Sequence, residues 1–310
     1  MTPQQIDYVV QPTDDGMRLD ALVVQLLGGR VPRTQVRKLF ESQAVRVAER
    51  VAIKSWRARP GDTLSIAVAS SSTTPAPAHD VQLRVCLERD DLVVVDKPSG
   101  MPTAPIDPRE TGTLVNGLVA RYPEMVGIGY HSREPGILHR LDTGTSGLLV
   151  AARTQRAFEF LAASLRCGHM RKEYYLVCEG DGLADMGRID IPIGIDPRKP
   201  RRAVACTHSE QMRRCNPRPA QTNYKVAARH DRFALVVAEA SKAARHQIRV
   251  HFAAIGHPLV GDDLYGGNCQ ALQRHALHAR LIAAPGCNDV APFEVMSDLP
   301  EDMAALLRSR

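Results

Sequence analysis

The stretch of sequence that bears most directly on the fold is HRLDTGTSGL, residues 139–148. It places Asp142 two residues after Arg140 and follows the aspartate with small and hydroxylated residues. This pattern predicts a polar loop that leads into an apolar strand at residues 147–152. Backbone N–H groups and hydroxyls in such a loop can hold a carboxylate ionised and oriented. An Arg-Leu-Asp tripeptide alone is more often a structural pair in a turn, and Arg18-Leu19-Asp20 repeats it near the N-terminus, so the surrounding sequence has to decide.

A protein-kinase catalytic loop also contains His-Arg-Asp. Here Leu141 separates the arginine from the aspartate, and the chain has neither a glycine-rich nucleotide loop nor an Asp-Phe-Gly motif. The kinase interpretation is therefore excluded.

Further short motifs lie on both sides of residues 139–148 in a fixed order. They are Lys97-Pro98-x-Gly100 before the stretch, then Arg171-Lys172-Glu173-Tyr174, His246-Gln247-Ile248-Arg249-Val250-His251, Gly256-His257-Pro258-Leu259, Gly261-Asp262-x-x-Tyr265-Gly266 and Leu277-His278-Ala279 after it. Together they resemble the RluA family of RNA pseudouridine synthases, whose pattern H-R-L-D-x-x-T-S-G-L matches at every fixed position. The resemblance spans roughly residues 92–281.

The resemblance implies an isomerase that detaches uracil from its ribose and reattaches it through carbon, with no metal and no other cofactor. The family's invariant aspartate corresponds to Asp142, which would act as a nucleophile or a base at the anomeric centre. Tyr174 would stack on the target base, although a tyrosine on a strand can also be a core residue. Arg249 would pair with the aspartate and keep it charged.

The same resemblance suggests residues that contact the RNA. We expect Arg140 to fill the space that an extruded uridine vacates, and His246, Gln247 and Ile248 to line the substrate site. His139 is expected to hold the loop by a structural hydrogen bond. The chain departs from the family in one place, because Ala243-Ala244 stands where the family has Gly-Arg; this affects substrate preference more than chemistry.

A low-complexity segment, ASSSTTPAPAHD at residues 69–80, is typical of an interdomain linker. It predicts a small domain at residues 1–68 and a larger one at residues 81–310. In the larger piece, strands and helices mix without regular alternation. We expect an α+β fold: a mixed, largely antiparallel central sheet of the pseudouridine synthase type with flanking helices, including a helix at residues 245–255.

The small domain is expected to be an α/β RNA-binding unit. Residues 30–59 hold nine basic and two acidic residues, and Arg33 and Arg37 share one face of a predicted helix. A solvated basic face is one explanation, and a surface that follows an RNA backbone is the preferred one. Residues 17–68 resemble the RNA-binding domain of ribosomal small-subunit protein S-four. That domain closes its strand pair with Asn-Gly; here Ala48-Glu49 follows the strand, so a looser turn is expected.

The composition limits the remaining possibilities. The chain has 310 residues, a formal charge of +6 and seven cysteines with no Cys-x-x-Cys pair, which favours free thiols and a cytoplasmic location. Cys206, His208 and Cys215 fit no familiar zinc spacing. We expect no membrane-spanning segment and a monomer.

The sequence thus favours an RNA pseudouridine synthase whose substrate is large-subunit ribosomal RNA. Three alternatives stay open. They are a transfer-RNA pseudouridine synthase, a catalytically silent RNA-binding or ribosome-assembly protein, and a metal-dependent nuclease, for which the sequence shows no carboxylate or histidine cluster.

Overall fold

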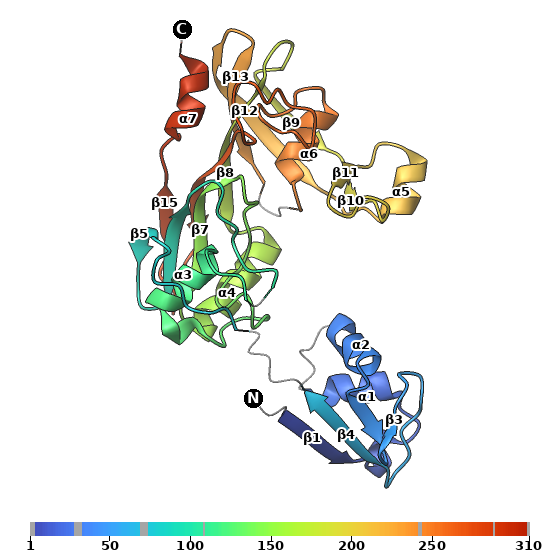
Figure 1. Cartoon of the computed structure of the whole chain (residues 1–310). Helices are drawn as coiled ribbons and strands as arrows, with labels where there is room; N and C mark the ends of the chain where they lie inside the picture. The colour runs from blue at the N-terminus through green and yellow to red at the C-terminus, as the bar shows by residue number, and fades with distance from the viewer. Residues whose placement is uncertain are drawn as a thin grey trace. The chain divides into compact units, whose positions relative to one another are not determined.

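The computed structural model describes residues 4–27, 33–68, 74–107, 109–240, 244–287 and 289–308. The chain forms two compact units, Met1–Ser72 and Thr73–Arg310 (Figure 1). The first half of the predicted linker, residues 69–73, lies outside the described residues. In the second half, the backbone of Ala76 and Ala78 hydrogen-bonds to Asn116, so this part packs on the second unit.

The first unit is a four-stranded antiparallel sheet with two helices. Its elements are β1 (Gln4–Val9), a short 3-10 helix (Pro12–Asp14), α1 (Leu19–Leu26), α2 (Arg33–Glu41), β2 (Val45–Val47), β3 (Arg50–Val51) and β4 (Thr63–Val68). The strand order is β1-β4-β2-β3. Leu22, Val36, Leu64 and Ile66 form its small core.

The prediction of a looser turn after β2 is wrong. Val47 pairs with Arg50, so Ala48 and Glu49 form a two-residue hairpin turn. Their φ angles are 45° and 64°, the left-handed conformation that Asn-Gly adopts more easily. Because the β2–β4 pairing fixes the start of the hairpin, these residues adopt the tight turn at a cost in backbone strain.

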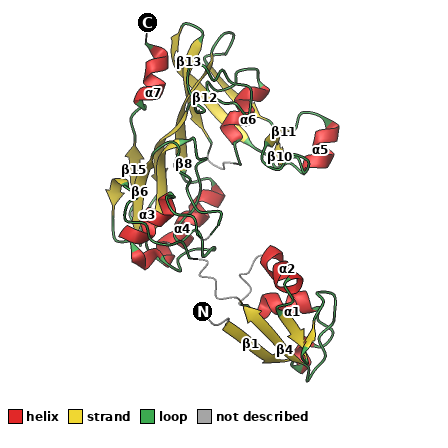
Figure 2. Ribbon diagram, in the orientation of Figure 1, coloured by secondary structure: helices red, strands yellow, loops and turns green. Residues whose placement is uncertain are grey.

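The second unit is built on a nine-stranded sheet (Figure 2). Its strands are β5 (Arg84–Glu88), β6 (Leu92–Lys97), β7 (Ser146–Ala152), β8 (Arg171–Glu179), β9 (Met186–Asp190), β12 (Gln221–His230), β13 (Phe233–Glu239), β14 (Leu277–Ala284) and β15 (Phe293–Met296). The order is β5-β6-β7-β14-β8-β13-β12-β9, with β15 paired to β14. In the described residues β7–β14 is parallel and the other pairs are antiparallel. The predicted mixed, largely antiparallel α+β sheet is confirmed.

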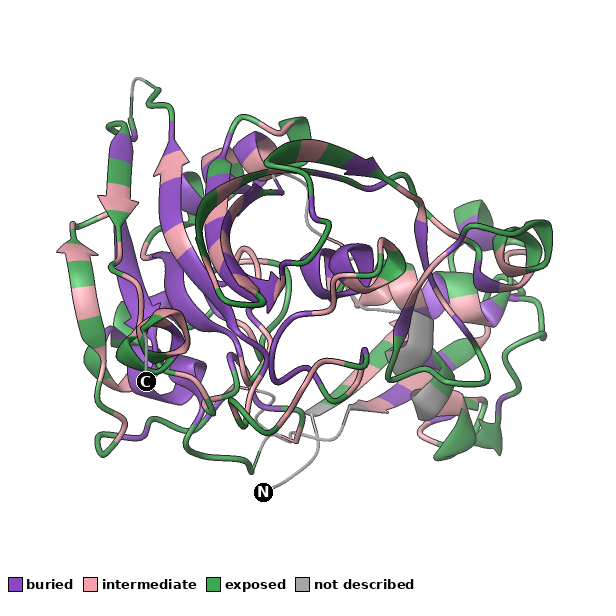
Figure 3. Cartoon of the chain, turned by 90° about the horizontal axis from the view of Figure 1, so that it is seen from above, coloured by how far each residue is buried: buried purple, intermediate pink, exposed green. Residues whose placement is uncertain are grey.

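Helices cover both faces of this sheet. The remaining elements are α3 (Leu114–Arg121), a 3-10 helix (Pro123–Met125), α4 (Gln155–Cys167), β10 (Ile193–Ile195), β11 (Ala203–Ala205), α5 (Ser209–Cys215), α6 (Gln247–Ala254), α7 (Glu301–Ala304) and a last 3-10 helix (Ala305–Leu307). Val93 and Val95 of β6 belong to the core cluster on one face, which also includes residues of α3 and, toward the other end of the sheet, of α6. Leu92 and Val94 pack with α4 on the other. Both faces of the central strands are therefore buried, as Figure 3 shows.

The ends of α4 and α6 show which single residues terminate these helices. Thr154 caps α4 by accepting a hydrogen bond from Ala157 N at 3.2 Å, and Gly256, with φ 87°, follows the end of α6. However, the helix expected at residues 245–255 begins only at Gln247. His246 has φ 56° and stands outside it, so the side chains of His246 and Arg249 do not share a helical face. No described helix is both long and apolar enough to cross a bilayer.

Candidate active site

The loop that carries Asp142 is fixed on several sides just before β7 begins. Lys97, fully buried at the end of β6, donates from Nζ to the carbonyl oxygens of Pro98, Met101 and Thr143 at 2.9, 2.8 and 3.3 Å. Gly100 N also donates to Thr143 O, at 2.8 Å. Burial lowers the pKa of Lys97 to about 8. The Lys97-Pro98-x-Gly100 motif therefore clamps the residue next to Asp142.

Two histidines hold the other end of the loop. Thr145 Oγ1 lies 2.8 Å from His275 Nε2, and Ser146 Oγ lies 2.9 Å from His278 Nδ1. Burial lowers the pKa of both histidines to about 4, so both are neutral near pH 7. Gly147 crosses β14 so closely that a Cβ atom there would lie 2.3 Å from Ala279 O. The small and hydroxylated residues after Asp142 are thus required by contacts to β14 and to the loop before it.

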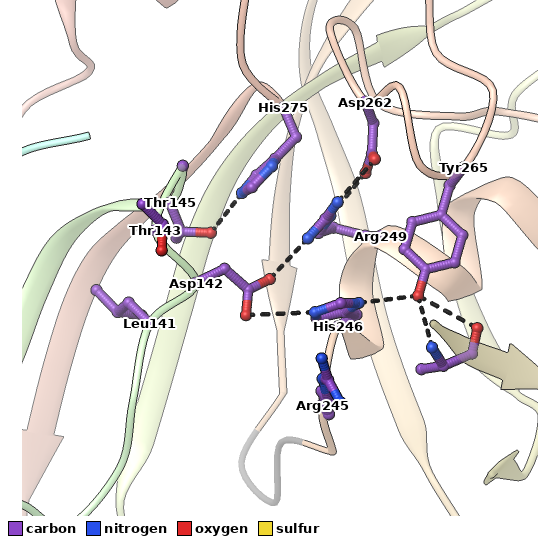
Figure 4. A network of polar contacts seen from close by, with 12 residues as sticks. Leu141, Asp142, Thr143, Thr145, Arg245, His246, Arg249, Asp262, Tyr265 and His275 are labelled. Carbon is purple, nitrogen blue, oxygen red and sulfur yellow. Dashed lines mark hydrogen bonds and ion pairs between the residues drawn. The ribbon is translucent and has the colours of Figure 1, made fainter. Parts of the chain in front are cut away.

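The guanidinium of Arg249 links the carboxylates of Asp142 and Asp262 (Figure 4). Arg249 Nη1 donates to Asp142 Oδ2 at 2.9 Å, while Arg249 Nε and Nη2 donate to the two oxygens of Asp262 at 2.7 and 2.8 Å. Asp262 is fully buried and Arg249 nearly so, whereas the Asp142 side chain is 30% exposed. Burial lowers the pKa of Arg249, but its bonds to Asp262 and Asp142 more than offset this and raise it above the ordinary value. The arginine therefore stays charged and fixed, and Asp142 is the member that solvent or substrate can reach.

His246 lies on the opposite side of the same carboxylate. Its Nε2 is 3.7 Å from Asp142 Oδ1, and its Nδ1 is 2.9 Å from the Tyr265 hydroxyl. That hydroxyl also accepts from Ala203 N at 3.0 Å. Burial lowers the pKa of His246, which favours the neutral ring. The left-handed backbone at His246 aims its ring at Asp142 (Figure 4).

Tyr174 lies on β8, where it is 6% exposed within the main core cluster. Burial, and then the negative charge of Asp142, raise its pKa. The Tyr174 phenol is therefore neutral near pH 7, and the negative charge of Asp142 acts on it. Asp142 also accepts a hydrogen bond from Arg249, so its carboxylate interacts with both residues.

The residues expected to contact substrate are distributed differently. Ile248 is 4% exposed and packs in the core. Gln247 is buried and donates to Gln221 O and Thr222 Oγ1 at 2.7 and 3.1 Å, so both support α6. Arg140 is exposed and pairs with Glu134 at 3.1 Å.

The two arginines of the first unit lie on α2. Arg37 is exposed and pairs with Glu41 at 3.2 Å. The side chain of Arg33 lies outside the described residues.

His139 does not show the expected hydrogen bond at one of its ring nitrogens. Its Nε2 atom is buried, and no partner for that atom occurs among the described residues. Burial, with a smaller effect of Lys172, lowers its pKa to about 3. The His139 ring is therefore neutral near pH 7.

Sequence reasoning assigned no role to Asp262, Tyr265, His275 or Lys97. Asp262, Tyr265 and Lys97 lie inside quoted motifs, so a signal was present without a function attached to it. His275 lies two residues before the Leu277-His278-Ala279 motif and gave no signal. Within the described ranges, no three His, Cys, Asp or Glu side chains are grouped closely enough to hold a metal ion.

The fold and this site define an RNA-modifying isomerase. Residues 91–254 match the family described as RNA pseudouridylate synthase, and the chain belongs to that family. It is 33% identical over 308 residues to an uncharacterized RNA pseudouridine synthase of Bacillus subtilis, YlyB, covering 98% of each chain. It is 32% identical over 319 residues to ribosomal large subunit pseudouridine synthase D of Nitrosomonas europaea, covering 98% of this chain and 87% of that one.

Solved structures agree with this assignment. The human protein RNA pseudouridylate synthase domain containing 1 superposes with a TM-score of 0.57 at 26% identity. The match covers 72% of this chain and 85% of the human one.

Proposed function

We propose that this chain converts one or a few uridines of large-subunit ribosomal RNA to pseudouridine, with Asp142 as the catalytic carboxylate and Arg249 and Tyr174 beside it. The observation that carries the proposal is the position of Asp142. It is the partly exposed end of a buried Asp262–Arg249–Asp142 chain. The ribosomal substrate is supported by relatives from Nitrosomonas europaea and Haemophilus influenzae that are named ribosomal large subunit pseudouridine synthase D.

The reaction breaks the bond between uracil N1 and ribose C1′ and forms a bond between C5 and C1′. The base turns in between, C5 loses its proton and N1 gains one, so the nucleotide keeps its atoms. Asp142 can serve either as a nucleophile at C1′ or as a base, and both routes need its ionised form. Arg249 Nη1 donates a charge-assisted hydrogen bond to Asp142 Oδ2 at 2.9 Å, which orients the carboxylate.

The surrounding residues would hold the base while it is detached. The Tyr174 ring offers a flat apolar surface for stacking, and His246 closes the opposite side of the carboxylate. Gln247 and Ile248 act behind them, by fixing α6. Arg140 is exposed beside the catalytic loop, where its guanidinium plane can replace an extruded base in the stack.

Within the pseudouridine synthase family, we assign the chain to the RluA group. We assign the first unit as an RNA-binding domain of the S-four type. Arg33 and Arg37 would contact the RNA backbone there, and the enzyme would work as a cytoplasmic monomer. The basic composition of residues 30–59 supports this use of the first unit.

The test is a transcriptome-wide pseudouridine map of cells that lack the chain, complemented with the wild type, Asp142→Ala or the exposed neighbour variant Asp263→Ala. We expect one or a few large-subunit ribosomal sites to vanish and to return with the wild type and Asp263→Ala only. Loss of sites in transfer RNA would instead give that substrate. An unchanged map would refute the catalytic assignment and favour a silent RNA-binding protein.

A further inference from the structure

An insertion between β9 and β12 carries an unusual concentration of positive charge. It consists of the β10–β11 hairpin and α5, which extend beside α6 (Figure 1). Residues 196–218 contain seven basic and two acidic residues, a net charge of +5. The two acidic residues, Asp196 and Glu210, both pair with Arg214. The remaining positive charge therefore has no neutralising partner inside the insertion.

The charge is densest in the hairpin loop at residues 198–202, which we call the basic loop. Four of its five side chains are basic and all four are exposed: Arg198, Lys199, Arg201 and Arg202. Within the described part of the chain, none of them forms an ion pair with a carboxylate. Four like charges within five residues repel one another, which is unfavourable in the unbound protein. A polyanionic partner would reverse that cost.

The basic loop is anchored to residues around Asp142. Arg245 donates from its two Nη atoms to the carbonyl oxygens of Pro200 and Arg201 at 2.9 and 3.1 Å. The Arg202 guanidinium lies 5.0 Å from the centre of the Tyr265 ring. Arg245 is the chain neighbour of His246, and Tyr265 hydrogen-bonds to that histidine. Figure 4 shows Arg245 directly below His246 and Tyr265 on its far side.

These contacts fix where the loop can act. The guanidinium fork of Arg245 holds two successive carbonyl groups, which orders the backbone of the loop and leaves its four charged side chains in solvent. The loop is therefore held next to His246, which faces Asp142, so RNA that leaves the site on the His246 side meets it. Phosphate contacts by arginine and lysine position a nucleic acid without reading its sequence.

We propose that the basic loop binds the phosphates of the nucleotides that flank the target uridine, and that Arg245 is the positioning residue that docks it beside the active site. The inference rests on the proposed function, because it takes RNA to be the substrate. The proposal also gives a role to Arg245. This arginine directly follows Ala243-Ala244, which stand where the family has Gly-Arg. Ala243 itself lies outside the described residues.

The test compares two double variants of the full-length protein with the same loss of charge. One is Arg198→Gln with Arg201→Gln in the basic loop. The control is Lys225→Gln with Arg232→Gln, two exposed residues without a carboxylate partner among the described residues. Thr222 and Tyr224 of β12 contact α6, so Lys225 faces the other side of the sheet. Arg232 lies in the β12–β13 turn, which is remote from Tyr174 along the strand.

Two measurements are made on each protein. Fluorescence anisotropy with a short uridine-rich single-stranded RNA gives the dissociation constant as a function of salt. Release of tritium from ribosomal RNA labelled at uridine C5 gives KM and the single-turnover rate at saturating RNA. For the basic-loop variant we expect a salt slope smaller by about 1.4, since each single-strand phosphate contact contributes about 0.7. We also expect KM to rise roughly tenfold and the saturating rate to change less than about twofold.

The outcomes separate the two proposals. Equal salt slopes and KM values for the two double variants would overturn the basic-loop inference even if the enzyme is fully active. A loop variant that loses rate at saturating RNA with an unchanged slope would overturn it as well. A wild-type protein that releases no tritium from any RNA, yet shows the slope difference, would overturn the proposed reaction and keep the RNA surface.

Discussion

Asp262 offers the sharpest test of how the active site is held. It is fully buried and accepts two hydrogen bonds from Arg249, at 2.7 and 2.8 Å. The change Asp262→Asn keeps the shape of the side chain but removes its charge. It also turns one acceptor into an N–H group that faces the N–H groups of the guanidinium. Among the described residues, Asp142 is then the one carboxylate that still pairs with Arg249.

The size of the effect follows from burial. Removing one member of a buried ion pair costs about 3–5 kcal/mol. Because Asp142 still accepts from Arg249 at 2.9 Å, we expect the lower end of this range, about 3 kcal/mol. In a unit of this size the melting temperature falls about 2–4 °C per kcal/mol, so a decrease of about 6–12 °C is expected. Arg249 is also released to turn toward Asp142, and misplacement of a catalytic group by about 1 Å costs up to about 100-fold in rate.

The assay pairs calorimetry with tritium release at a temperature where both proteins are folded. The matched control is Asp263→Asn, the exposed next residue with the same loss of charge, for which we expect a change within about 0.5 kcal/mol and an unchanged kcat. If Asp262→Asn melted and turned over like Asp263→Asn, the idea that Asp262 fixes Arg249 for Asp142 would be refuted.

Three further predictions concern the site in the second unit. Asp142→Asn should lower single-turnover tritium release by at least about 1000-fold while RNA affinity by anisotropy is retained; near-normal turnover would remove Asp142 from the chemistry. Tyr174→Phe should keep most activity and Tyr174→Leu should lose about 1–3 kcal/mol in kcat/KM, the value of stacking on one base; equal losses would argue against stacking. Because burial lowers the pKa of His275 from about 6.5 to about 4, the folded protein binds fewer protons than the unfolded chain in this range. Stability should therefore fall by about 3 kcal/mol as pH drops through it, and urea titrations of His275→Asn should show a smaller fall.

The strained hairpin turn gives a prediction of its own. Replacing Ala48-Glu49, whose φ angles are 45° and 64°, with Asn-Gly should stabilise the first unit by about 1–2 kcal/mol. The measurement is the melting transition of that unit. No gain would mean that the residues are not held in the left-handed conformation in solution.

Local sequence signals gave much of the framework, for identifiable reasons. The apolar run at residues 92–95 became β6 because both faces of a central strand are buried. Thr154 and Gly256 marked helix ends because capping and left-handed backbone depend on single residues. The helix predicted at residues 245–255 begins two residues later than expected, at Gln247, because His246 takes a left-handed backbone and contacts Tyr265. A distant partner of this kind leaves no periodic signal.

The sequence by itself determined the class of the protein, the catalytic candidates Asp142, Tyr174 and Arg249, and the polar loop that presents the aspartate. These properties reside in short motifs whose chemistry depends on residue type and spacing. Only the tertiary structure decided that Asp262 fixes Arg249, that Gln247 and Ile248 support α6 from within, and that Arg245 docks the basic loop beside His246. Such roles arise from residues brought together across the sheet, where burial and hydrogen-bond geometry, rather than position along the chain, determine what each side chain does.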